Sequence, residues 1–80
     1  MIVRVIGTRL IYLDGLRLAE LRHAHGLTMR GAAALLGVSA AAVCFWEHEQ
    51  TSPSAAQVEA LHTLYGDALE SSGALTVEDL

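Results

Sequence analysis

The stretch from Gly26 to Glu47 (GLTMRGAAALLGVSAAAVCFWE) restricts the possible folds of this chain more than any other segment. Thr28 and Ser39 each precede a run rich in Ala, Leu and Val. Such hydroxyl residues favour helix N-termini because their side-chain oxygen accepts a backbone N–H. Glycine between the runs permits the left-handed conformation that ends a helix. The stretch therefore predicts two short helices, about 29–36 and 40–48, joined by the turn Gly37-Val38-Ser39.

Two further helices are predicted on either side of this pair. The first covers about 15–24, where Asp14 can cap the N-terminus and Gly26 follows the last turn. The second covers about 54–65 and ends at Gly66. Leucines and valines recur in both segments at helical spacing, so each helix has an apolar face that must pack against the other helices.

The N-terminal residues favour β-structure. Apolar, β-branched runs at 2–6 and 9–13 flank Gly7-Thr8, which predicts a hairpin. An isolated hairpin is only marginally stable. These strands must therefore either pack on the helices or pair with the strands of a second subunit, and we expect the latter contact to make a dimer.

The C-terminal residues follow Gly66, which ends the last predicted helix. We expect a loose tail over 67–80, with one helical turn at Asp67 to Glu70 and another after Thr76. The predicted organisation has three parts: an N-terminal strand or hairpin over 1–14 with a dimer contact, a helical domain over 15–66, and the tail.

Charge is distributed unevenly along the chain. The formal net charge is −4, whereas nucleic-acid binders usually present a basic surface to phosphates. All five arginines fall in residues 1–30, and residues 31–80 carry seven acidic side chains and no Lys or Arg. A basic surface can therefore form only from the first part of the chain.

The single cysteine and the hydropathy pattern bear on the cellular compartment. Cys44 cannot form an intramolecular disulfide, which is typical of a reducing compartment. The apolar run at the N-terminus is short and is interrupted by Arg4 and Arg9, unlike a signal peptide. No stretch approaches the length of a membrane span. We expect a cytoplasmic protein with no membrane association.

The segments LRLAELRHAHGLTMRGAAALLGVSAAAVCFWE and TSPSAAQVEALHTLYG together resemble the phage repressor/Cro-type (XRE-like) helix-turn-helix family over residues 16–66. The matching positions are Leu18, Leu21, Arg22, Gly26, Leu27, Thr28, Ala33, Leu36, Gly37, Val38, Ser39, Val43, Trp46, Glu47 and Pro53. The resemblance implies a mostly α, lambda-repressor-like bundle of four to five helices. It also implies a repressor-like transcriptional regulator that binds double-stranded DNA, as a homodimer reading two major-groove half-sites.

The resemblance also assigns roles to individual residues. An ion pair between Arg22 and Glu47 would hold the second motif helix in register. The N-terminus of the first motif helix would contact the DNA backbone, the second would enter the major groove, and the loop after it would return to the backbone. The corresponding residues are, in that order, Thr28, Met29 and Arg30; Ser39, Ala40, Ala41, Cys44 and Phe45; and His48, Gln50 and Thr51.

The second motif helix, which would enter the major groove and is here called the reading helix, departs from the family pattern. Members commonly carry side chains there that donate hydrogen bonds to base edges, whereas Ala40, Ala41 and Phe45 have none to offer. Contacts with thymine methyl groups, or selection by DNA shape, remain open to it. The alternative is a helix-turn-helix scaffold diverted to protein binding, such as an antirepressor or modulator, whose apolar patch of Met29, Cys44, Phe45 and the two alanines binds another regulatory protein.

Other classes of site have little support in the sequence. Cys44, His48, His23 and His25 could converge near the end of the second motif helix, but their spacing matches no standard zinc signature, so we predict no metal site. No catalytic triad, phosphate-binding glycine loop or carboxylate pair is apparent, and we expect neither an enzyme nor a cofactor. His62 lies inside the predicted last helix, where we expect a structural role.

Overall fold

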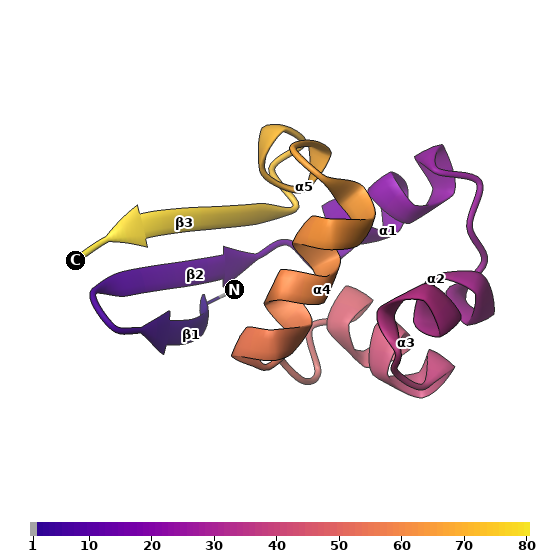
Figure 1. The fold of residues 1–80 in the computed structure, drawn as a ribbon, viewed down its shortest axis with the longest axis horizontal. Helices are drawn as coiled ribbons and strands as arrows, with labels where there is room; N and C mark the ends of the chain where they lie inside the picture. Colours follow the sequence, from indigo (N-terminus) through magenta and orange to yellow (C-terminus); the bar gives the residue numbers. More distant parts are fainter. Residues whose placement is uncertain (1) are drawn as a thin grey trace.

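The computed structural model describes residues 2–80 and contains eight elements (Figure 1). In chain order they are β1 (Ile2–Ile6), β2 (Arg9–Leu13), α1 (Gly15–Ala24), α2 (Met29–Leu36), α3 (Ala40–Glu47), α4 (Ala55–Tyr65), α5 (Ala68–Ser71) and β3 (Leu75–Asp79). The predicted fold class is confirmed: the described chain is a mostly helical helix-turn-helix bundle with an N-terminal hairpin.

The helices begin at the residues that the sequence marks as caps. The side chains of Asp14, Thr28 and Ser39 accept hydrogen bonds from the backbone N–H groups three residues further on, at 3.0–3.1 Å. Helix α4 begins one residue later than expected, because Ser54 and Gln57 form a reciprocal capping box at 2.7 and 3.2 Å. Local side-chain chemistry thus sets the start of each of these helices.

The N-terminal hairpin forms with the predicted strands, and a third strand completes an antiparallel sheet in the order β1-β2-β3. Strand β3 pairs with the other edge of β2, with Leu75 opposite Leu13 and Val77 opposite Ile11. The helical turn expected after Thr76 is therefore wrong. The segment is a strand because its apolar side chains alternate with polar ones and the free edge of β2 satisfies its backbone.

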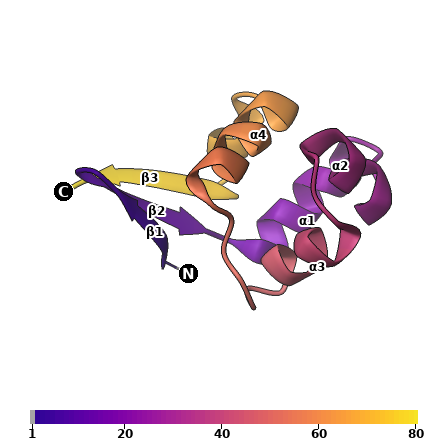
Figure 2. The same ribbon diagram turned by 60° about the horizontal axis from the view of Figure 1, so that its bottom comes forward.

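One hydrophobic core joins the sheet to the helices. Leu13, Leu69 and Ala74 are fully buried, and strands β2 and β3 therefore pack against the helices of their own chain. Figure 2 shows the sheet extending to one side of the helical body, with α4 between the sheet and α2. The dimer contact expected of the hairpin stays a prediction. The cluster comprises Ile11, Leu13, Leu18, Leu21, Ala33, Leu36, Val43, Trp46, Val58, Leu61, Tyr65, Leu69, Ala74 and Leu75.

The helices are short compared with a membrane span. Within residues 2–80, no single helix is both long and apolar enough to cross a bilayer. Helices α2 and α3 meet those requirements of length and composition only when counted together, and they are bent by 109° relative to each other.

Candidate nucleic-acid interface

Helices α2 and α3 meet in the geometry of a helix-turn-helix. The 109° between them lies within the range of about 90–120° that characterises this motif. Gly37 ends α2 with φ 71° and ψ 31°, a conformation that a β-carbon would strain. Ala32 and Ala33 are buried at the packing face of α2, and the Val38 N–H closes the turn on the Ala33 carbonyl at 3.0 Å. The turn therefore fixes the angle between the two helices.

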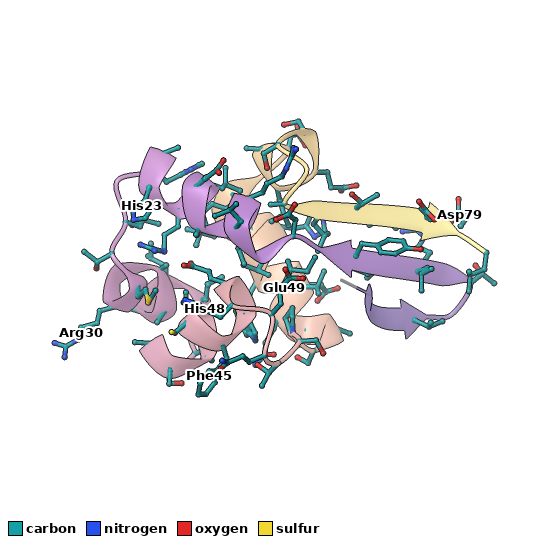
Figure 3. The ribbon with its side chains drawn as sticks, turned by 180° about the vertical axis from the view of Figure 1, so that it is seen from behind. His23, Arg30, Phe45, His48, Glu49 and Asp79 are labelled. Atoms are coloured by element: carbon teal, nitrogen blue, oxygen red, sulfur yellow. The ribbon has the colours of Figure 1, made fainter. Side chains whose placement is uncertain are left out.

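Helix α3 presents opposite faces to the core and to solvent. Val43 and Trp46 are 3% and 2% exposed and lock α3 onto the other helices. Ala41 and Phe45 point outward, and 42% of Phe45 is exposed. Figure 3 shows the Phe45 side chain projecting from the helical body. The outward face is thus held on a helix whose opposite face is anchored in the core.

A buried ion pair links the end of α1 to the end of α3. The Arg22 guanidinium donates from Nε to Glu47 Oε2 at 2.7 Å and from Nη2 to Oε1 at 3.0 Å. Its Nη1 also donates to the Leu27 carbonyl at 2.9 Å, in the loop before α2. The hydrogen bond to Glu47 raises the pKa of Arg22, against the lowering effect of burial. The ion pair implied by the resemblance is therefore present and braces three segments of the motif.

Gly15 provides a second link that the sequence analysis missed. It is buried at the first position of α1, where a β-carbon would collide with the backbone carbonyl of Glu47. Only glycine allows the start of α1 to approach the end of α3 this closely. Nothing in the local sequence indicates this contact, because Gly15 follows an N-cap and reads simply as part of the first helical turn.

The predicted contact residues differ in their accessibility. Arg30, Gln50 and Thr51 are exposed, and Figure 3 shows Arg30 directed away from the body. Thr28 and Ser39 are exposed too, although each hydroxyl oxygen already accepts an N-cap hydrogen bond. Other predicted contact residues are less accessible: Met29 and Ala40 are partly buried against the core, and Cys44 is also partly buried.

Comparison with known protein families agrees with this geometry. The family described as a helix-turn-helix domain matches residues 15–68, which extend from the start of α1 to the start of α5. The chain belongs to this helix-turn-helix family. No curated protein and no solved structure gives a significant match. The match covers α1 to α4 and leaves the three strands and most of α5 outside it.

Among the arginine side chains that the structure describes, all but one, which lies on the motif, are paired with a carboxylate. Arg9 Nε lies 3.6 Å from Asp79 Oδ1, and Arg17 Nε lies 3.5 Å from Asp14 Oδ2. Arg22 is buried against Glu47. Arg30 lacks such a partner among the described side chains. An unpaired guanidinium on the first motif helix is available for an external anion.

Three of the four histidines of the helix-turn-helix protein, and its cysteine, have local partners. His48 Nδ1 lies 2.8 Å from the Cys44 carbonyl and 3.6 Å from its Sγ. His25 Nδ1 lies 2.9 Å from the Leu21 carbonyl, and its ring packs edge-on against Tyr65. His62 bridges the Val58 carbonyl and Glu70, at 3.2 and 3.0 Å. In the part of the chain that the structure describes, no three His, Cys, Asp or Glu side chains come together as a metal site would require.

Proposed function

We propose that this protein is a DNA-binding transcriptional regulator of the repressor type, which inserts α3 into the major groove. The observation that carries the proposal is the way in which contacts at its inner face and at its end fix the orientation of α3. Its inner face is anchored by Trp46, its end is braced by the bidentate Arg22–Glu47 pair, and its outer face is left to solvent. A reading helix must hold a fixed tilt for its outward side chains to reach base edges.

Phosphate contacts would come from the first motif helix and from the loop after α3. Arg30 supplies the unpaired positive charge, and the exposed Thr28, Gln50 and Thr51 supply neutral donors. Few cations are involved, so few counterions would be released on binding. We therefore expect weak binding at physiological salt by a single copy, and a shallow dependence of affinity on salt.

Dimerisation through β1 would compensate for weak binding by one copy. Strand β1 is at one edge of the sheet, and its exposed Val5 adds apolar surface. The opposite edge, β3, carries Glu78 and Asp79, whose charges would repel those of a second β3. Antiparallel pairing of two β1 strands would join both sheets about a two-fold axis. Each helix-turn-helix of the dimer would then bind one half-site of the DNA.

The test measures binding to a mixed-sequence duplex by fluorescence anisotropy over a salt series. Binding that weakens with salt is expected, and Arg30→Ala should reduce the slope of log affinity against log salt by about 1. Arg17→Ala is the matched control, because it removes the same charge from a side chain that bonds to the Ser72 carbonyl beside α5. Absence of binding even at low salt would refute the proposal.

A second candidate function is protein binding through α3. It is favoured by the exposure of Phe45 on a chain with a net charge of −4. In that case Phe45→Ala would abolish capture of a protein partner, whereas Arg30→Ala would leave it unchanged. The two variants therefore separate the two functions, since Arg30→Ala should weaken DNA binding and leave protein binding unchanged.

A further inference from the structure

The centre of the outward face of α3 carries no side chain that can form a hydrogen bond. Ala41 and Phe45 stand one helical turn apart on this face, and both are exposed. The Ser39 hydroxyl oxygen accepts a hydrogen bond from the Ala42 N–H at 3.1 Å, and the Cys44 thiol lies against His48 Nδ1 at 3.6 Å. The centre of this surface is therefore apolar. The polar groups beside it have partners within the helix, although the Ser39 hydroxyl keeps its hydrogen for donation, as the Thr28 hydroxyl does.

The major groove presents one apolar group to such a surface. Guanine, adenine and cytosine edges offer acceptors or donors, and thymine adds a C5-methyl group. If Phe45 covered a guanine or cytosine edge, polar atoms would lose water without gaining a partner, which is unfavourable. If it covered a methyl group, both apolar surfaces would leave water, which is favourable.

We propose that α3 recognises C5-methyl groups of pyrimidines in the major groove, through Phe45 and Ala41. This inference rests on the proposed DNA-binding function and names its target chemistry. The methyl group can belong to thymine or to 5-methylcytosine, which carry it at the same ring position. Residues one turn apart on a helix have Cβ atoms about 5–6 Å from each other. That distance lies between one and two base steps of about 3.4 Å, so the methyl groups of two neighbouring bases are within reach.

The test removes the methyl group from DNA without changing base pairing. Duplexes are first selected from a random pool with the full-length protein at low salt, and the bound sequences are then resynthesised with deoxyuridine in place of thymidine. Burial of one methyl group contributes about a fourfold gain in affinity, so a loss of about fourfold per contacted thymine is expected. In the second arm, the selected sequences are resynthesised with 5-methylcytosine in place of cytosine. A gain in affinity of similar size shows that the recognised methyl group can be that of 5-methylcytosine.

Two variants establish whether the methyl effect arises at α3. Methyl groups also alter duplex shape, which a protein can sense indirectly. Phe45→Ala should shrink the deoxyuridine penalty, and Arg30→Ala should lower affinity while leaving that penalty unchanged. Phe45 lies outside the buried core cluster, so the variant should keep its fold, as circular dichroism would verify.

The outcomes separate this inference from the function on which it rests. A penalty for deoxyuridine or a gain from 5-methylcytosine, either one reduced by Phe45→Ala, supports methyl recognition. Equal affinities in both arms, or an effect that Phe45→Ala leaves intact, overturn methyl recognition while DNA binding stands. If no duplex binds at low salt, the proposed DNA-binding function fails as well.

Discussion

Replacing Arg22 by Met tests whether the buried Arg22–Glu47 ion pair stabilises the helix-turn-helix. The side chains of Arg22 and Glu47 are only 6% and 3% exposed, so the substitution leaves a carboxylate buried without its partner. Removing one partner of a buried ion pair lowers the free energy of unfolding by about 3–5 kcal/mol. In domains of 60–100 residues, about 1 kcal/mol corresponds to about 4–8 °C in Tm, so Arg22→Met should lower the Tm by about 12–40 °C.

The assay is urea unfolding of the full chain at neutral pH, followed by far-UV circular dichroism, with thermal unfolding alongside. The double variant Arg22→Met/Glu47→Leu is the matched control, since it removes both charges and retains similar volume. Replacing a buried ion pair by apolar side chains is often neutral or stabilising. We therefore expect the double variant to recover most of the stability that Arg22→Met loses.

Two results would refute this reasoning. If Arg22→Met changes the free energy of unfolding by less than about 1 kcal/mol, the pair behaves like an exposed surface ion pair. If the double variant is as unstable as Arg22→Met, the loss comes from the apolar packing or from the Leu27 carbonyl that Arg22 also binds, and not from an unpaired carboxylate.

Other predictions concern single residues of the fold and the reading face. Gly15→Ala should destabilise by about 1–3 kcal/mol in urea unfolding, because its β-carbon meets the backbone at the end of α3; wild-type stability would contradict this contact. Burial raises the pKa of Tyr65 above 10.0, so the folded state holds the phenolic proton more tightly. The free energy of unfolding should therefore be unaffected by titration of Tyr65 below about pH 10 and should decrease as the pH rises further. In unfolding experiments over a pH series, Tyr65→Phe should reduce this decrease. Leu75→Ala should cost about 2–5 kcal/mol by the same unfolding assay, since Leu75 is 1% exposed. Ala41→Gln should add a base-edge donor and shift the sequences selected from a random pool towards adenine; an unchanged selection would argue against groove contact at that position.

Much of the local structure could be predicted because the signals lie within a few residues. The caps Asp14, Thr28 and Ser39 and the turn at Gly37 require only a side-chain oxygen or a missing β-carbon beside the backbone that it serves. The hairpin strands followed from two apolar runs around a glycine turn. The Arg22–Glu47 pair, by contrast, was implied by the family resemblance and not by spacing.

The errors arose where distant segments decide the outcome. The C-terminal residues carry only a short apolar alternation, and they become β3 because β2 offers a free edge and the core has room for Leu75. Met29 was expected in an exposed patch, but the packing of α2 turns it partly into the core. Neither result can be derived without knowing which elements are neighbours in space.

The helix-turn-helix follows from the amino-acid sequence alone, since each helix start, the glycine turn and the apolar faces depend on residues close together in the chain. The sequence also determined that the reading helix lacks base-edge donors such as Gln or Arg. The packing of the helices, by contrast, sets the outward face of α3, which consists mainly of Ala41 and Phe45, and brings Gly15 and Arg22 against the end of that helix. The physical reason is that burial and close approach are properties of packed pairs of elements, which no single segment encodes.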